Sequence, residues 1–494
     1  MNPTLCRILK GFLLVVLSCP AFVEAGLPRS APEAQGVSSA AILSFVDAAD
    51  RQLDSLHSLM ILRHGQVVAE GWWAPYHSEA NHSLYSLSKS FTSTAVGIAI
   101  AEGKLSLDDE VLKAFPEDAP ASPGDNLKGM RLSDLLRMNT GNQTEPPRPM
   151  DVSWTKAFLG HAVPFKPGTH FLYNTSATYM ASAMIQKKTG ETLLDYLHPR
   201  LFGPLGISHP TWELSPQGIS TGGYGLSIRT EDIASFGQLY LQRGEWNGKQ
   251  LVPAAWIDAA TARQTSNGSN PASDWDQGYG YQFWRCRHGA YRGDGAFGQF
   301  CIVLPEQDAV IAITAGVKDM QAVLNVVWEK LLPAFRSNPL PEDADNAGAL
   351  SRRLKALSLP VVEGKGAPAE VFGKRFTFPE NERKLESIVV ERGDNGETAA
   401  VLKARINGAD HRIALGRGRW VSGKSAWLRL KEQPVGACGA WTADNQLTAK
   451  LCYYETPFTI AVRLEFSGNE VRLTSDANMW FGPTQEADLR GTAE

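Results

Sequence analysis

The chain has 494 residues, which is too long for one ordinary domain and long enough for a large core with a second module. Its 48 lysines and arginines nearly balance its 52 aspartates and glutamates, and the net charge of -4 comes without a basic tract. This balance argues against nucleic acid as a partner.

Residues 1–25 have the pattern of a secretory signal. Arg7 and Lys10 precede an apolar run over residues 12–17, and small residues lead up to the expected cleavage site. The run is too short to cross a bilayer, so we expect an exported, periplasmic protein with no membrane span. The alternative is lipid anchoring through Cys19, although the proline that follows makes a poor lipoprotein site.

Four cysteines remain beyond the signal, namely Cys286, Cys301, Cys438 and Cys452. An even number of cysteines in an exported protein permits disulfides. Each consecutive pair lies symmetrically about a predicted turn, so its members are placed to face one another across two strands. Ordinary buried thiols explain the same spacing, and the pairing stays open.

The pattern of residues 26–337 predicts an antiparallel sheet built from both ends of this region. Apolar strand-like runs flank a turn at His64-Gly65, and residues 105–260 are mainly helical in pattern. Three more strands and a closing helix are expected at residues 279–284, 297–303, 310–314 and 319–332. We therefore predict an α/β domain, with a sheet flanked by helices and a helical subdomain.

A change of composition separates a second module. Residues 338–368 are rich in proline, glycine, alanine and charge, which indicates a linker. Over residues 369–494, short alternating runs are separated by turn signals such as Asn407-Gly408, with no helical period. This part is predicted to be an all-β, barrel-like domain.

Ser86 and Lys89 form a Ser-x-x-Lys motif at the head of an apolar run. In a helix, positions i and i+3 share a face, so the hydroxyl and the ammonium stand side by side. A lysine that is partly desolvated has a lowered pKa and, once neutral, accepts the proton of a neighbouring hydroxyl. A second match, Ser153 to Lys156, follows a proline-rich segment and reads as a loop, so the context favours Ser86 as a nucleophile.

Tyr173 lies in a loop just before a predicted helix. A loop position presents a phenol to a site, where a nearby ammonium favours the phenolate and allows it to act as a base. The plainer interpretation is a tyrosine that anchors the start of the helix.

Taken together, five segments resemble the serine β-lactamase-like superfamily with class C-type architecture. This superfamily includes class C β-lactamases, D-Ala-D-Ala peptidases, family VIII carboxylesterases and 6-aminohexanoate-dimer hydrolases. The resemblance covers roughly residues 30 to 335 and predicts a β-lactamase/transpeptidase-like fold. Its segments, in chain order, are Tyr85–Ser93, Glu102–Asp109, Asp134–Gly141, Pro167–Tyr173 and Phe202–Ile207.

The resemblance implies acyl transfer through a covalent intermediate. Ser86 is expected to attack a carbonyl, and Lys89 and Tyr173 to share the proton transfers, with the identity of the base left open. Two backbone amides are needed to stabilise the developing oxyanion. One is expected from Ser86 itself, and by resemblance the other comes from Ala296 on a sheet strand.

Two departures from the family pattern bear on the substrate. The usual Tyr-x-Asn occurs here as Tyr173-Asn174-Thr175, which displaces the asparagine by one position. The usual Lys-Thr-Gly or His-x-Gly is missing, and Ala290-Tyr291-Arg292 stands where it is expected. Because that motif holds the substrate carboxylate in β-lactamases, its loss favours esterase or amidase activity. The candidate substrate-binding residues are Asn174, Trp154 and Gly295.

The C-terminal β domain resembles the lipocalin-like domain that follows the catalytic domain in some bacterial serine hydrolases. The resemblance rests on Gly373–Phe376, Trp420, Trp441, Tyr453–Phe458 and Asn478–Gly482. A structural cap and a ligand-binding module are both compatible with it.

The sequence thus predicts a serine hydrolase that cleaves small esters or amides through a Ser86 acyl-enzyme. A β-lactamase or D-Ala-D-Ala peptidase is the first alternative, and a catalytically silent binding protein is the second. No cofactor or metal is predicted, because the Gly-x-Gly-x-x-Gly run at Gly293–Gly298 lacks the following helix of a dinucleotide site and no residue set has metal-ligand spacing. The oligomeric state is not determined by the sequence.

Overall fold

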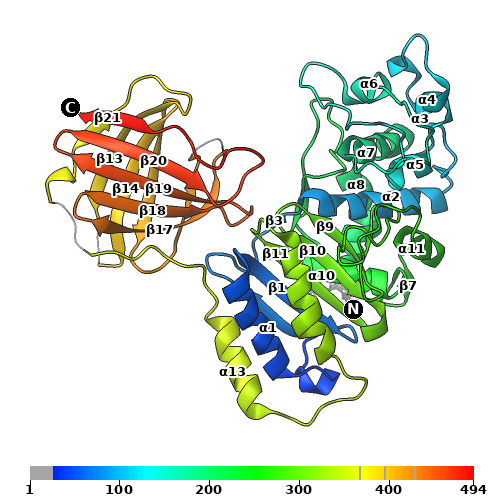
Figure 1. Cartoon of the computed structure of the whole chain (residues 1–494), viewed down its shortest axis with the longest axis horizontal. Coiled ribbons are helices and arrows are strands. Elements are labelled where there is room, and N and C mark those ends of the chain that lie inside the picture. Colours follow the sequence, from blue (N-terminus) through cyan, green and yellow to red (C-terminus); the bar gives the residue numbers. More distant parts are fainter. Residues whose placement is uncertain (1–25, 366–368, 394–395, 428–429) are drawn as a thin grey trace, which may run out of the picture.

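The structure is a computed structural model that describes residues 26–365, 369–393, 396–427 and 430–494. The predicted signal segment, including Cys19, lies outside these residues. Figure 1 shows a sheet with helices on its faces and, beside it, a β-barrel formed by the last part of the chain. None of the helices in the described ranges is both long enough and apolar enough to cross a membrane.

A six-stranded antiparallel sheet is assembled from the two ends of the N-terminal region, as predicted, in the order β2-β1-β11-β10-β9-β8. At the tip of the first hairpin, His64 and Gly65 have φ values of 51° and 73°, a left-handed turn that glycine favours. The strands are β1 (Leu56–Arg63), β2 (Gln66–Trp72), β8 (Trp284–Arg285), β9 (Tyr291–Gly295), β10 (Gln299–Leu304) and β11 (Ala309–Ala315).

Both faces of this sheet are covered by helices. The covering helices are α1 (Ser39–Gln52), α10 (Thr230–Leu241) and α12 (Met320–Val326). Successive side chains of a strand point to opposite faces. Leu59 and Ile61 therefore join a core with α1 and α12, whereas Met60 and Leu62 join a core with α10. This double burial explains why β1 is apolar at consecutive positions.

The helical subdomain lies above the sheet in Figure 1, with α2 along its lower edge. Helix α2 carries the Ser-x-x-Lys lysine and is buried from Ser88 to Ala99. A small sheet in the order β3-β5-β4 and a hairpin of β6 and β7 complete this region. The elements are α2 (Ser88–Ala101), α3 (Val111–Ala114), α4 (Asp125–Gly129), α5 (Leu132–Leu136), α6 (Trp154–Leu159), α7 (Thr175–Thr189), α8 (Leu193–Leu197), α9 (Gly203–Leu205), α11 (Ala254–Thr261), β3 (His82–Ser83), β4 (Thr211–Trp212), β5 (Leu226–Ile228), β6 (Glu245–Trp246) and β7 (Lys249–Gln250).

The predicted linker is not irregular throughout, because it contains helix α13 (Ala344–Lys355). Leu350 is buried in the core shared with α1, and Arg353 pairs with Asp47 of α1. Leu354 approaches Gly71 of β2, where a Cβ would lie 3.0 Å from one of its methyl carbons. Leucines with helical spacing thus fasten this segment to the N-terminal region, although its composition indicated a spacer.

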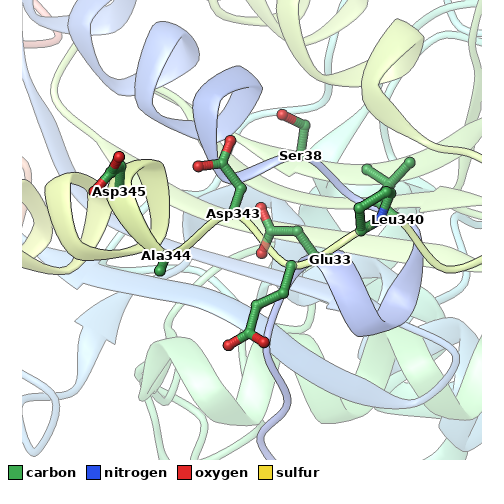
Figure 2. A pocket seen from close by; sticks show the side chains of 8 residues that line it. Glu33, Ser38, Leu340, Asp343, Ala344 and Asp345 are labelled. Carbon is green, nitrogen blue, oxygen red and sulfur yellow. The ribbon is translucent and has the colours of Figure 1, made fainter.

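An open pocket of about 540 Å³ lies between the starts of α1 and α13, and Figure 2 shows its acidic lining. Ser38 and Asp343 are the N-caps of these two helices, and Glu33 accepts hydrogen bonds from Ser39. Glu33, Ser38 and Asp343 therefore serve the local structure, and Ser86 is not part of the lining of this pocket.

The C-terminal region forms a barrel, as predicted. Ten strands run in the order β15-β14-β13-β12-β21-β20-β19-β18-β17-β16, and an additional pairing of β15 with β17 closes the sheet around its own apolar core. The strands are β12 (Arg375–Thr377), β13 (Leu385–Arg392), β14 (Thr398–Ile406), β15 (Ala409–Gly416), β16 (Val421–Ser425), β17 (Gln433–Ala443), β18 (Gln446–Cys452), β19 (Thr459–Ser467), β20 (Glu470–Ala477) and β21 (Leu489–Ala493).

The four cysteines of the described residues are buried free thiols, so neither possible disulfide is formed. Cys438 lies opposite Lys450 rather than opposite Cys452, because the register of β17 and β18 is offset from the symmetric turn. Cys301 lies opposite Gly293 in the β9–β10 pair. Of the two alternatives left open by the sequence, the structure thus agrees with ordinary buried thiols.

We predict that Ile311→Ala, in the centre of the main sheet, lowers the free energy of unfolding by about 2 to 5 kcal/mol, since it removes a fully buried side chain and leaves a cavity. Leu214→Ala is the control, because Leu214 is 55% exposed and its loss should change stability by less than about 0.5 kcal/mol. Urea unfolding followed by circular dichroism measures both. Equal effects for the two variants would contradict the packing described here.

Candidate active site

Ser86 and Lys89 meet at the start of α2. A 3₁₀ turn, Tyr85–Leu87, leads into the helix and leaves Ser86 partly exposed, whereas the Lys89 side chain is buried. The Lys89 Nζ lies 2.9 Å from the Ser86 Oγ and donates to it. It also donates to the carbonyl oxygen of Gly223 at 2.8 Å and to the Thr175 Oγ1 at 3.3 Å. The local i, i+3 geometry is therefore the predicted one.

Burial lowers the pKa of the Lys89 ammonium to about 7, because the charged form loses its hydration. Glu145 raises the pKa and Arg148 lowers it, and both act less strongly than burial. A lysine with this pKa is neutral in a large fraction of molecules near neutral pH. A neutral amine beside a serine hydroxyl is able to accept its proton.

Tyr173 lies against the same two residues. Its ring is stacked on Trp284 with a centroid distance of 5.2 Å, and the Lys89 Nζ lies 4.8 Å from its centroid. Burial is the main cause that raises the pKa of the Tyr173 phenol far above its usual value, although a hydrogen bond with Ser86 acts in the opposite direction. The phenol is therefore protonated at neutral pH, which favours Lys89 rather than Tyr173 as the base.

Strand β9 approaches the nucleophile through glycines. A Cβ on Gly295 would lie 1.9 Å from the carbonyl oxygen of Leu84, and one on Gly293 would lie 2.5 Å from the Ser90 Oγ. Ala296 follows directly in the turn to β10. The backbone hydrogen bonds of this turn use the amides of Gly298 and Val317, and among the described residues no backbone carbonyl accepts the amide of Ala296. Its role in an oxyanion hole remains a prediction.

The other side of β9 carries a buried ion pair. The Arg292 Nε donates to Asp294 at 2.9 Å, and its Nη1 donates to Cys286 and to the Asp274 carbonyl oxygen. Burial raises the pKa of the Asp294 carboxyl even though Arg292 opposes the shift. The segment beside Ser86 is thus Gly293 to Ala296, and Arg292 is held in the interior rather than presented to a substrate.

Two predicted substrate-binding residues have structural roles instead. Asn174 is fully buried and caps α7, where its Oδ1 accepts the Ala177 amide at 3.0 Å. Trp154 is buried in the helical core, with its Nε1 donating to the carbonyl oxygen of Pro149 and its ring against Tyr179. We therefore withdraw the substrate-binding assignment for both. Gly295 does lie beside the nucleophile turn.

Residues that the sequence interpretation missed complete the site. Thr175 contacts Lys89 and lies two positions after Tyr173, where the family pattern has asparagine. Accepting threonine at the third position of the Tyr-x-Asn motif would have identified this residue from the sequence. Gly223 acts through a carbonyl, which leaves no side-chain signal. Glu145 accepts the Thr175 amide at 3.1 Å and pairs with Arg148, which in turn donates to Ser176.

The sequence profile described as Beta-lactamase matches residues 48–322, which is more than half of the chain. The chain therefore belongs to the beta-lactamase family.

Several curated proteins are similar in sequence. A 6-aminohexanoate-dimer hydrolase from Paenarthrobacter ureafaciens is 24% identical over 278 residues, covering 51% of this chain and 71% of that protein. A beta-lactamase from Escherichia coli K12 is 26% identical over 232 residues, covering 42% and 58%, respectively. The chain thus spans less than two thirds of the second relative.

The fold is shared with solved structures. A provisionally named beta-lactamase from Bacteroides dorei superposes with a TM-score of 0.50 at 16% sequence identity, over 59% of this chain and 98% of that one. At this identity the likeness concerns the fold alone.

We predict that Asn174→Ala destabilises the protein by about 1 kcal/mol without raising KM for a small ester, because it removes a helix cap and no substrate contact. Asn174→Ser retains a capping oxygen and is the matched control. Thermal unfolding and steady-state kinetics test both variants. A raised KM at unchanged stability would restore the substrate-binding role.

Proposed function

We propose that this chain is a serine hydrolase that cleaves small esters or amides through an acyl-enzyme on Ser86. The observation that carries the proposal is the contact of the Ser86 Oγ with Lys89, whose buried ammonium has a pKa of about 7. The relatives support the class, since a dimer hydrolase and a beta-lactamase are both hydrolases by name.

In the proposed mechanism, neutral Lys89 takes the proton of the Ser86 hydroxyl while the Oγ attacks the substrate carbonyl carbon. The amides of Ser86 and Ala296 stabilise the resulting oxyanion, at about 3 kcal/mol for each donor. The proton on Lys89 then reaches the leaving group through the protonated Tyr173 phenol, whose ring lies next to the Lys89 Nζ. The bond to the leaving group breaks, and the acyl group stays on Ser86.

Deacylation repeats these steps with water. Lys89 is neutral again and takes a proton from the water molecule, while the water oxygen attacks the acyl carbon. Ser86 leaves with the returned proton, and a carboxylic acid is released. Each turnover thus consumes one water and restores the three residues, with no cofactor in the proton balance.

The electrostatics of β9 favour esters and amides over β-lactams. A β-lactam carries a carboxylate, for which a nearby cation is favourable. The only cation on β9 is Arg292, which is fully buried and paired with Asp294. A carboxylate brought next to Gly293 and Gly295 would find no cation on that face of the strand, because Arg292 lies on the other face. For this reason the β-lactamase or D-Ala-D-Ala peptidase alternative is the weaker one, and nitrocefin turnover by the intact chain would revive it.

The central prediction is covalent labelling. A fluorophosphonate should label Ser86, and Ser86→Ala should abolish both labelling and the hydrolysis of p-nitrophenyl acetate. Ser153→Ala is the matched control, because Ser153 begins the second Ser-x-x-Lys motif and bonds Thr155 and Asp118 instead of a lysine. Mass spectrometry of the adduct identifies the residue. Equal turnover by wild type and Ser86→Ala would end the proposal of a Ser86 acyl-enzyme, whereas neither labelling nor turnover by the wild type would support the silent binding protein.

A second prediction concerns pH. The neutral form of Lys89 is the proposed base, and its pKa is about 7. We therefore expect kcat/KM to rise about tenfold for each pH unit below this pKa and to be constant at higher pH. Lys89→Arg keeps the charge, cannot accept a proton and should lose about 10²- to 10⁴-fold in rate. Circular dichroism at each pH separates catalysis from unfolding. A flat profile through neutral pH would exclude Lys89 as the base.

We also propose that the chain is exported to the periplasm, which rests on the signal pattern of residues 1–25 alone. Mass spectrometry of the mature N-terminus after expression in a Gram-negative host tests it. Cleavage near residue 25 is the expected result, and a lipidated Cys19 would establish the alternative.

A further inference from the structure

Four aromatic rings meet beside the nucleophile, two from the N-terminal region and two from the barrel. Phe481 packs on Phe297 at a centroid distance of 4.7 Å and on Tyr85 at 5.5 Å. Phe458 lies 5.8 Å from Phe297 and 6.5 Å from Tyr85. We call these four residues the aromatic flank.

The aromatic flank borders both amides of the predicted oxyanion hole. Tyr85 directly precedes Ser86, and Phe297 directly follows Ala296. Both aromatic residues have left-handed backbones, with φ values of 47° and 68°. Such conformations are unfavourable for bulky residues and persist when the surroundings hold them. The backbones of these two residues are therefore held by the surrounding structure, one on each side of the predicted oxyanion hole.

The barrel side of the flank is also held firmly. In the loop over residues 453–458, the Glu455 carbonyl oxygen accepts the Ser83 amide at 2.9 Å, three positions before the nucleophile. The loop with Phe481 is closed by a hydrogen bond from the Ala477 amide to the Thr484 carbonyl oxygen at 2.9 Å. Figure 1 shows this orange end of the barrel reaching toward β3.

The ring of Phe481 is nevertheless mostly open. Its residue is 69% exposed, although it touches two other aromatic residues. A large apolar side chain that is rigidly presented beside a reacting centre gains free energy when an apolar group covers it. The leaving group must lie near Tyr173 and Lys89, which supply its proton. An acyl group on the opposite side of the carbonyl would lie over Ala296, next to Phe297 of the flank.

We propose that the aromatic flank binds the apolar acyl part of the substrate, so that the barrel helps to determine specificity. The substrates are then esters or amides of carboxylic acids with a medium-length alkyl or an aryl group. This inference rests on the proposed hydrolase function and gives the barrel a role distinct from that of a cap or a separate ligand carrier.

The test compares p-nitrophenyl acetate, butyrate and octanoate with the full chain. Phe481→Ala should lower kcat/KM for the octanoate by at least about tenfold and for the acetate by less than about twofold, because only the longer acyl group reaches the ring. Phe481→Leu should retain most of the octanoate activity. Phe378→Ala is the matched control, since Phe378 packs on Gly491 of the same barrel.

Chain-length selectivity decides the outcome. An unchanged octanoate-to-acetate ratio in Phe481→Ala, or an equal loss with all three esters, would overturn the inference. If the alanine variant fails to fold, Phe481→Gln takes its place in the comparison of ratios, and Phe481→Leu remains the apolar control. If the wild type shows neither Ser86 labelling nor Ser86-dependent turnover, the proposed function itself is wrong, and the inference falls with it. If Ser86 is labelled but the octanoate-to-acetate ratio is unchanged in Phe481→Ala, only the role of the aromatic flank is refuted, and the proposed hydrolase function stands.

Discussion

The burial of the Lys89 ammonium is the constraint on which the site depends. Removing a charge from water costs several kcal/mol unless a counter-charge lies close by, and the hydrogen-bond partners of Lys89 in the described residues are neutral. The fold resolves this conflict by lowering the pKa to about 7. The helix that carries Lys89 is buried over most of its length, so hydration cannot be restored by a local movement of the side chain. The stability lost on burying this amine is what makes it a base.

Close approach of strand β9 is the second requirement, and it explains the missing motif. The strand comes so near to the 3₁₀ turn at Ser86 that Gly293 and Gly295 have no room for a Cβ. A cation on this side of the strand would have no space. Arg292 lies instead on the opposite side, where Asp294, Cys286 and the Asp274 carbonyl oxygen satisfy its guanidinium. The strand thus still lies close to Ser86, but it lacks the side chains that would bind a substrate carboxylate in the family pattern.

The barrel is joined to the rest of the molecule at the site itself. Its core closes on itself, as expected for an independent module, yet its loops bond the segment that leads to Ser86. The Tyr76 Oη donates to the Thr456 carbonyl oxygen, which lies 380 positions along the chain. Contacts of the linker with the barrel, such as Trp420 with Leu359, add to this attachment. A barrel attached here is well placed to shape what the nucleophile meets, which a remote cap would not do.

The sequence by itself determined the features that depend on local geometry. The spacing of Ser86 and Lys89 places them together in any helix, and apolar runs at both ends of the N-terminal region determine a sheet with two buried faces. Only the tertiary structure decided which remote groups complete the site. Thr175 rather than Asn174 contacts Lys89, because the Asn174 side chain caps a helix. Gly223 contributes a backbone carbonyl oxygen, which its residue type does not indicate. Helix α13, the separate thiols and the placement of Phe481 beside Tyr85 likewise follow from long-range packing. Such contacts depend on how distant segments meet, and residue spacing does not encode that.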